Sequence, residues 1–444
     1  MKVLLSQEEC EFEASSVVDP VGRLFSYQGR IFRAISPQFC DFVLDTLDLA
    51  EEKNWFDLGL VFTQKTDYSF PGFPLILEHR RVPFVTVRSE WSAEGLREAT
   101  LCCLRLATAV AESNLCLKDA HPWNFLFNRA TPYMIDWGSI RPISELDWDF
   151  WYFQFRKYFL VPLYLFSIGQ HRFARALLRE HSVGVGNSIL DLHVTACLPE
   201  QPYQIFQRRT KLLPNEVYDK LADYVSGLSL PPIDGEWVKY EQPRFVGADS
   251  FHSPRRKESI IYPLMRSDPG KTVLDFGCNF GLHSQICAAL GKCVIAADIE
   301  ETCINDLFLR VKQQRDDILT LYLDFLWPMG ESGMMNSIPA VDRRLACDTV
   351  LVLALVHHLV FKHHASFESI ARNISRFSKA RAIVEFVPSE DHHVAQWSPE
   401  QFSWYTLDNF ATAMRKYFRR FDLIPGDPEP RKVLVFEDKR SHAN

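Results

Sequence analysis

Residues 272–300, TVLDFGCNFGLHSQICAALGKCVIAADIE, decide the fold of the C-terminal half of the chain. Their order predicts a short apolar strand, a glycine turn, a helix over residues 282–290 that Gly291 ends, and a second buried strand, CVIAAD. Glycines let the backbone of the turn approach a ligand with no Cβ in the way. The helix that follows offers free N–H groups at the positive end of its dipole. The stretch therefore predicts a βαβ unit with a ligand-binding turn.

The expected ligand-binding residues lie in this turn and at the end of the second strand. They are Asp275, Gly277, Cys278, Asn279, Gly281 and Asp298. In nucleotide-binding α/β sheets, a carboxylate at the position of Asp298 accepts hydrogen bonds from ribose hydroxyls. The glycine spacing differs from the G-x-G-x-x-G pattern of dinucleotide binding. An ordinary βαβ unit with a glycine-rich loop is the alternative interpretation.

The form D-x-G-x-x-x-G resembles motif I of class I S-adenosylmethionine (SAM)-dependent methyltransferases. In that family the turn wraps the methionine part of SAM, and the acid after the second strand holds the ribose. The resemblance implies the first role for Asp275, Gly277 and Gly281, and the second for Asp298.

The α/β pattern continues to the end of the chain. It predicts a third strand over 318–325 that ends in Asp324, a fourth over 348–360, a fifth over 380–388, a helix over 404–418 and two closing strands. Five strands that alternate with helices, followed by a strand pair, are typical of the seven-stranded, Rossmann-like sheet of class I methyltransferases. The resemblance implies that Asp324 binds the adenine amino group.

His357, His358 and Glu385 are the candidate catalytic residues. Ligands of open α/β sheets bind at the carboxyl ends of strands, where the His pair is expected to lie, and Glu385 is expected inside the fifth strand. A neutral imidazole there can take a proton from an acceptor hydroxyl or amine. A structural or substrate-positioning role for the His pair is the alternative. We expect no metal site, because no H-x-x-x-H arrangement with a carboxylate occurs.

The N-terminal residues are expected to be rich in strands. Residues 22–35 predict a hairpin around Gln28-Gly29, and short apolar runs predict strands over 58–62 and 82–87. Residues 39–49 and 93–113 predict helices, the second with apolar residues at a helical period.

Residues 117–140, LKDAHPWNFLFNRATPYMIDWGSI, form a second motif. The spacing of Asp119, Asn124 and Asp136 resembles the catalytic-loop and metal-binding segments of protein-kinase-like phosphotransferases. In those enzymes the first Asp orients the acceptor hydroxyl, and the Asn and the second Asp hold magnesium, so the resemblance implies Mg²⁺ and ATP. A glycine-rich phosphate loop is missing, and Arg33 stands where a strand lysine is expected. A structural relic or a substrate-binding platform is the alternative.

Three regions follow from these patterns. Residues 1–230 are expected to form an α+β domain with the kinase-like segment, and residues 145–230 of it are expected to be helical. Residues 231–268 form a linker and a lid helix, in which Tyr240 and Trp237 are candidates for contact with the cofactor. Residues 269–444 form the methyltransferase domain.

Composition narrows the class of protein. The net charge of −7 argues against a nucleic-acid scaffold, so no nucleic acid is expected as a partner. The 11 cysteines are scattered and form no C-x-x-C pair, which favours reduced thiols in a cytoplasmic protein. The most apolar segment is about half the length needed to span a bilayer, so no membrane span is expected.

Several motifs together resemble one family. LKDAHPWNFLF, PYMIDWGSI, DFGCNFG, LALVHHL and VEFVPSEDHHV are similar to motifs of bacterial SAM-dependent methyltransferases that resemble rhizobial nodulation proteins. The resemblance covers nearly the whole chain. It implies transfer of a methyl group from SAM to a hydroxyl, amine or carboxylate of a small molecule or glycan. The alternatives are a bifunctional kinase–methyltransferase that acts on one acceptor and a non-catalytic SAM-binding protein.

Overall fold

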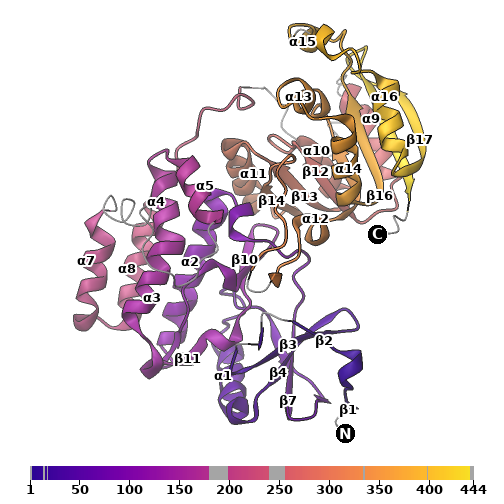
Figure 1. Cartoon of the computed structure of the whole chain (residues 1–444). Coiled ribbons are helices and arrows are strands. Elements are labelled where there is room, and N and C mark those ends of the chain that lie inside the picture. The colour runs from indigo at the N-terminus through magenta and orange to yellow at the C-terminus, as the bar shows by residue number, and fades with distance from the viewer. Residues whose placement is uncertain are drawn as a thin grey trace. The chain divides into compact units, whose positions relative to one another are not determined.

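The computed structural model describes residues 3–13, 16–17, 19–179, 199–239, 256–333, 336–397 and 399–440. The chain divides into two compact units. The first consists of Met1–Pro231 and Glu331–Ile338, and the second of Pro232–Gly330 and Pro339–Asn444. Each unit contains a sheet with helices around it, so the chain is a mixed α/β protein (Figure 1).

The first unit is built on a five-stranded antiparallel sheet. Its strand order is β2-β3-β4-β7-β5, with β2 (Glu11–Phe12), β3 (Gly22–Tyr27), β4 (Arg30–Ile35), β7 (Leu75–His79) and β5 (Thr63–Lys65). The predicted hairpin of residues 22–35 is confirmed as β3 and β4. Its two-residue turn has positive φ at Gln28 and Gly29, as hairpin turns that match the twist of the strands require.

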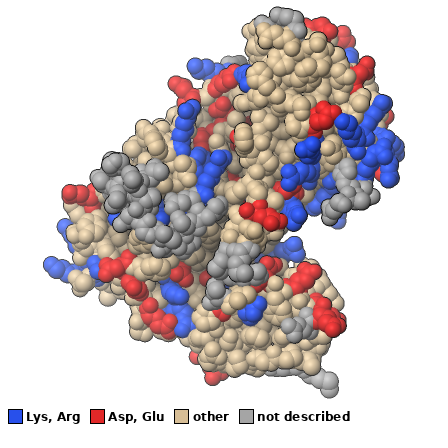
Figure 2. Space-filling view, viewed as in Figure 1, with Lys and Arg blue, Asp and Glu red and all other residues tan. Residues whose placement is uncertain are grey.

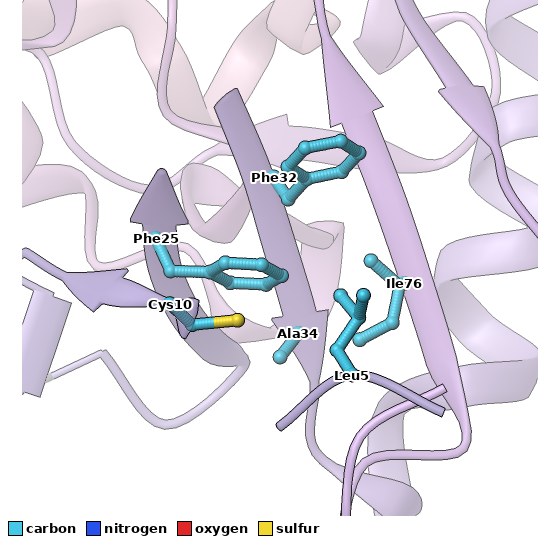
Figure 3. Packing of buried hydrophobic residues seen from close by; sticks show 6 residues of the cluster. All are labelled: Leu5, Cys10, Phe25, Phe32, Ala34 and Ile76. Atoms are coloured by element: carbon cyan, nitrogen blue, oxygen red, sulfur yellow. The ribbon is translucent and has the colours of Figure 1, made fainter. Parts of the chain in front are cut away.

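One side of this sheet carries a hydrophobic core. Phe25 and Phe32 on neighbouring strands stack with ring centroids 5.4 Å apart, and neither side chain is exposed. Figure 3 shows how side chains from five segments of the chain meet there: Leu5, Cys10, Phe25, Phe32, Ala34 and Ile76. Successive side chains of a strand point to opposite faces of the sheet, so Phe32 and Ala34, two residues apart on β4, lie on the same face.

Helices and short strand pairs complete the first unit. The predicted helices over 39–49 and 93–113 are confirmed as α1 (Cys40–Glu52) and α2 (Ala93–Ala111), and the Ser92 side chain caps α2 by accepting from the N–H of Gly95. The short strands are β1 (Val3–Leu4), β6 (Tyr68–Ser69), β8 (Leu115–Leu117), β9 (Phe125–Asn128), β10 (Thr131–Met134) and β11 (Ile140–Pro142). The other helices are α3 (Trp148–Phe155), α4 (Val161–Ser167), α5 (His171–Arg179), α7 (Glu200–Gln207) and α8 (Pro214–Ser226).

Two predicted strands are wrong. In residues 58–62 only Leu60 forms an isolated bridge, with Met134, and its N–H bonds to the carbonyl of Trp55 in a turn. Residues 82–87 form no strand, and Pro83 among them has no N–H to donate to a ladder. Short apolar runs do not distinguish a strand from a buried turn, because both bury their side chains.

The second unit contains a seven-stranded sheet. Its order is β14-β13-β12-β15-β16-β18-β17, in which β18 pairs antiparallel with both β16 and β17 and the other neighbouring strands pair parallel. The strands are β12 (Thr272–Phe276), β13 (Cys293–Asp298), β14 (Ile318–Tyr322), β15 (Cys347–Val352), β16 (Ser378–Phe386), β17 (Phe418–Pro425) and β18 (Lys432–Lys439). The five parallel strands consist almost entirely of buried residues, as is typical of sheets covered on both faces.

The helices of the second unit form two groups. In one, α9 (Arg256–Arg266) packs against α10 (Leu282–Ala289); in the other, α14 (Phe367–Phe377) packs against α12 (Val341–Arg344), α13 (Val356–Phe361) and α16 (Leu407–Arg415) (Figure 1). α11 (Glu301–Gln314) contacts β13 and β14, and α15 (His392–Ala395) is a single turn. Strand order reverses between β12 and β15, and this switch point is where ligands of such sheets bind.

Three predicted element boundaries need correction. The fourth strand ends at Val352, and His357 and His358 lie on α13 because the chain turns at Ala354, whose φ is 51°. The third strand ends at Tyr322, so Asp324 follows the strand and lies in a turn. The helix over 404–418 is shorter, Leu407–Arg415, because the Thr406 side chain caps its first turn.

The outer edge of the seven-stranded sheet is charged. Figure 2 shows Lys and Arg side chains gathered on the side of the second unit that carries β17. Arg419 and Arg420 on this edge strand are exposed. Charged edge strands resist pairing with a second chain. In the part of the chain that the structure describes, no helix is both long and apolar enough to cross a bilayer.

Candidate functional site

The turn after β12 takes a shape that requires glycine. Gly277 has φ +71° and donates its N–H to the carbonyl of Ala297 at 2.8 Å. Gly281 has φ +78°, and a Cβ there would lie 2.6 Å from both terminal methyl carbons of Leu307 on α11. The turn is therefore pressed between β13 and α11, and a side chain at either glycine would strain it.

Asp298 holds this turn from the end of β13. One carboxylate oxygen accepts the N–H of Asn279 at 2.7 Å, and the other accepts the N–H groups of Ile299 at 2.7 Å and Glu300 at 3.0 Å. Burial raises the pKa of the Asp298 carboxyl. A carboxylate has about four acceptor sites, so three backbone donors leave room for one donor from a ligand. The structure thus brings the predicted residues Asn279 and Asp298 together.

Asp275 faces α10. Its carboxylate accepts the Ser284 hydroxyl at 2.6 Å, the residue is 2% exposed, and burial raises the pKa of Asp275 to about 6. This bond fastens the first turn of α10 to β12. The Cys278 thiol is also buried, and burial raises its pKa far above the ordinary value, so it stays protonated.

Asp324 follows β14 at the same edge of the sheet. Its carboxylate accepts the N–H groups of Leu326 at 2.9 Å and Trp327 at 3.3 Å, which closes a turn. The N–H of Leu323 donates to the Asp298 carbonyl at 3.0 Å, so the segments that carry the two acids are neighbours. Tyr240, the remaining predicted cofactor residue, lies outside the described residues.

Residues 232–239, here called the strap, are bound to this edge. Ile233 exchanges two hydrogen bonds with the Thr302 hydroxyl, at 2.7 and 2.8 Å. The Asn279 side chain donates to the Trp237 carbonyl at 3.0 Å, and the Glu300 carboxylate accepts the backbone N–H groups of Glu236 and Trp237. Sequence reasoning missed Glu300 and Thr302, although both directly follow the predicted strand that ends in Asp298.

The His pair lies on α13 with its imidazole rings 4.0 Å apart. His357 is 4% exposed, and burial lowers the pKa of His357 to about 2 and that of His358 to about 3. The Nδ1 atoms of both are buried and have no hydrogen-bond partner among the described residues. Both imidazoles are therefore neutral at pH 7.

Glu385 is buried at the end of β16 and held by cations. Lys257 of α9 donates to one carboxylate oxygen at 2.7 Å, and Arg431 lies 3.7 Å from the other. Arg431 also pairs with Asp391 at 2.8 Å. Sequence reasoning missed Lys257, Arg431 and Asp391, because the pairs join residues that are 40 or more positions apart.

Two tryptophans flank the His pair. The Trp237 ring lies 4.2 Å from that of His358, and the Trp397 ring lies 5.1 Å from His358 and 5.8 Å from His357. The Lys362 ammonium lies over both indoles, 4.5 Å from the Trp237 ring and 5.1 Å from the Trp397 ring. In the described residues, no three His, Cys, Asp or Glu side chains are grouped so that they could hold a metal ion.

The kinase-like segment lies in the first unit, where Arg33 reaches Asp136. The guanidinium of Arg33 on β4 lies 3.4 Å from the Asp136 carboxylate and forms a second ion pair with Asp19. The Asp136 carboxylate also accepts the N–H of Gly138 at 3.0 Å. Arg33 thus places a buried positive charge on β4 beside the Asp136 carboxylate.

Asp119 and Asn124 lie close to Asp136 in the fold. The Asp119 carboxylate accepts the Gln154 amide at 3.3 Å, and the N–H of Ile135 donates to the Asn124 carbonyl at 2.8 Å. Burial lowers the pKa of His121, and the carboxylates of Asp119 and Asp136 both oppose this effect. The carboxylates of Asp119 and Asp136 therefore both raise the pKa of the same residue, His121.

The second unit has an open, mostly parallel α/β sheet with a topological switch point between β12 and β15. Its glycine turn, its acid after β13 and its two histidines after β15 all lie at the carboxyl edge of one parallel sheet.

Comparison with known proteins adds a likeness over the whole chain. The chain is similar to the nodulation protein NoeA of Rhizobium meliloti (strain 1021). The two sequences are 26% identical over an alignment of 464 positions, which covers 96% of this chain and 95% of that protein. The predicted resemblance to rhizobial nodulation proteins is therefore confirmed. No family model matches the chain.

Two solved structures resemble part of the chain. Magnesium protoporphyrin IX methyltransferase from Synechocystis PCC 6803, with bound SAH, is 18% identical, covers 45% of this chain and 89% of its own length, and has a TM-score of 0.32. The bifunctional kinase–methyltransferase WbdD is 16% identical, covers 46% of this chain and 46% of its own length, and also has a TM-score of 0.32.

Proposed function

We propose that the second unit is a SAM-dependent methyltransferase that transfers a methyl group to a hydroxyl, amine or carboxylate of a small molecule or glycan. The observation that carries this proposal is the bond between Asp298 and the backbone of Asn279 at the switch point. It joins a glycine turn open to a ligand with a carboxylate suited to ribose hydroxyls. In this proposal residues 269–444 form the methyltransferase domain and residues 231–268 the linker and lid.

The residues at the edge fit SAM. The turn from Gly277 to Gly281 has a glycine at each end, and Asp298 retains an acceptor site beside its three backbone donors. Asp324 lies on the neighbouring segment, where it would serve the adenine. When bound, SAM would supply the methyl group from a sulfonium. The strap lies against Asn279 and would exclude water from the turn.

The His pair is better suited than Glu385 to act as the base. Both imidazoles are neutral, and both have a buried, unbonded Nδ1. Glu385 instead accepts a hydrogen bond from Lys257 at one oxygen and lies 3.7 Å from Arg431 with the other, so its carboxylate is paired with two cations. His357 or His358 would take the proton that an acceptor loses, and Glu385 would hold the two cations in place.

Label transfer tests this function. The protein is incubated with methyl-labelled SAM and with small-molecule and glycan fractions from cells, and the labelled products are separated by mass. We expect labelled product from the wild type, and a reaction at least tenfold slower both from Asp298→Ala at low SAM concentration and from the double variant His357→Gln, His358→Gln. SAM binding without any labelled product would leave the non-catalytic SAM-binding protein as the function.

A second candidate function is a kinase in the first unit, which would make the protein bifunctional. The observation that favours it is Arg33, which supplies a cation beside Asp136 where a kinase carries lysine. In this role Asp119 would orient an acceptor hydroxyl, and Asn124 and Asp136 would hold Mg²⁺ for ATP. The candidate predicts magnesium-dependent ATP turnover that Asp136→Ala abolishes. Absence of turnover with the authentic acceptor would remove it.

A further inference from the structure

Lys362 occupies a site with the chemistry of a cation receptor. Its ammonium lies 4.5 Å from the ring of Trp237 and 5.1 Å from the ring of Trp397, here called the indole pair. The Glu236 carboxylate forms an ion pair with the same ammonium. Two electron-rich ring faces and a carboxylate are the set of groups that binds ammonium ions in proteins.

The indole pair lies directly beside the candidate base. The ring centroids of Trp237 and His358 are 4.2 Å apart. The Trp397 ring stacks on that of His357, with centroids 5.8 Å apart and 16° between the ring planes. All of these residues belong to the second unit. A cation held between the indoles would therefore lie next to two neutral imidazoles.

Lys362 is able to leave this site. Its side chain is 28% exposed and that of Glu236 is 59% exposed, so the ammonium can reach water, where hydration replaces its contacts with the indole pair and Glu236. Surface ion pairs of this kind contribute little to stability. The lysine thus behaves as a resident cation that an incoming cation can displace.

We propose that the indole pair and Glu236 bind an ammonium group of the methyl acceptor, which displaces Lys362. The proposal rests on the proposed methyltransferase function and narrows its acceptor to an amine. The acceptor would enter as R–NH₃⁺ between the two indoles.

R–NH₃⁺ transfers one proton to the neutral imidazole of His357 or His358, which becomes an imidazolium and leaves the neutral amine R–NH₂. This transfer is unfavourable, because burial lowers the pKa of both imidazoles, so the amine forms only transiently. The nitrogen lone pair forms the new C–N bond to the methyl carbon of SAM. The C–S bond breaks, and its electron pair stays on sulfur, so the sulfonium becomes the neutral thioether of SAH. The product R–NH₂–CH₃⁺ is again a cation that suits the indole pair.

A binding experiment tests the site without knowledge of the acceptor. Choline is titrated into the protein by calorimetry, with 3,3-dimethylbutan-1-ol, its neutral counterpart of equal shape, as the matched probe. We expect choline to bind and the alcohol to bind roughly three- to thirtyfold more weakly, the range of one cation–π contact. Equal affinity for the two probes would contradict a cation site.

Three variants test whether choline binds between the two indoles. Lys362→Met removes the resident cation and should strengthen choline binding severalfold, whereas a lysine that merely fastens the strap predicts no gain. Trp397→Leu should abolish choline binding. Trp327→Leu replaces a tryptophan that is 78% exposed elsewhere in the unit and should change nothing. Melting curves of all three variants show whether each is folded.

The SAM sulfonium is a second possible cation for this site, and one comparison separates the two. If the indole pair binds the acceptor, Trp397→Leu weakens the binding of choline. The ratio of the affinities for SAM and SAH then stays the same as in the wild type. A selective loss of SAM over SAH in Trp397→Leu would overturn the assignment to the acceptor. SAH binding by the wild type reports on the proposed function separately, so failure of the amine site and failure of the methyltransferase are distinguishable.

Discussion

In the proposed methyltransferase, Asp298 has two tasks. Three backbone N–H groups use its oxygens to hold the turn, and one acceptor site remains for a ligand. A residue that both shapes a turn and binds a ligand is expected at the end of the second strand of such a sheet. Loss of the Asp298 carboxylate should therefore reduce the affinity for the ligand in two ways, because a direct contact is lost and the turn is no longer held in shape.

Gly281→Ala should destabilise the second unit more than Gly291→Ala. Both glycines have φ close to +80°, which costs a non-glycine residue about 1–3 kcal/mol. Only at Gly281 would the new methyl also meet Leu307, at 2.6 Å, whereas nothing lies within 4 Å at Gly291. We expect an additional loss of about 1–3 kcal/mol for Gly281→Ala, measured by urea unfolding. Equal losses would show that Leu307 moves aside.

Stability should fall as the pH falls below about 6.5. His357 and His358 have folded pKa values of about 2 and 3, below the ordinary value of 6.5. Below pH 6.5 the two histidines therefore bind protons in the unfolded chain but not in the folded protein. The contribution of the neutral histidines to the free energy of unfolding is complete above pH 6.5 and is lost toward pH 3. His357→Gln should reduce the slope of unfolding free energy against pH by up to about 1.4 kcal/mol per unit between pH 6 and 4. An unchanged slope would mean that His357 titrates normally.

Among the elements, the parallel strands were predictable and α13 was not. Buried parallel strands are continuous apolar runs, and β12, β13 and β16 were found where such runs occur. The run VLVLALVHHLV is apolar throughout, so it has no period that separates its strand from its helix. The break at Ala354 depends on backbone conformation, which composition does not reveal.

The strap should loosen when its bond to α11 is removed. The Thr302 hydroxyl both accepts from and donates to the backbone of Ile233. Thr302→Val removes both bonds, each worth about 0.5–1.5 kcal/mol. We expect at least tenfold faster hydrogen exchange of residues 232–239 by mass spectrometry. Thr302→Ser keeps the hydroxyl and is the matched control. Unchanged exchange in Thr302→Val would show that Glu300 and Asn279 hold the strap alone.

For the whole molecule, the sequence predicted the elements at the site but not how they connect. The glycine turn and Asp298 were predicted as neighbours, because βαβ geometry brings them together. The pair of Lys257 and Glu385 joins residues 128 positions apart. Isolated charges carry no periodic signal, so such pairs are visible only once the chain is folded. The same holds for Arg33 and Asp136 in the first unit.

The two units should respond separately to Arg33→Met. Arg33 is 5% exposed and paired with Asp19 and Asp136, so its removal leaves carboxylates without their cation. Breaking a buried ion pair in this way costs about 3–5 kcal/mol, and the partly exposed acids place the loss at the lower end. We expect calorimetric scans to show a lower unfolding temperature for the first unit only. Loss of SAH binding in this variant would show that the second unit depends on the first.

The central claim is that the turn after β12 and Asp298 bind SAM. Calorimetric titration of SAH into the wild type and into Asp298→Ala tests it most directly. We predict binding by the wild type that weakens roughly ten- to a hundredfold in the variant, because hydrogen bonds to a charged group contribute about 1.5–3 kcal/mol. No binding by the wild type, or equal binding by both proteins, would contradict the claim.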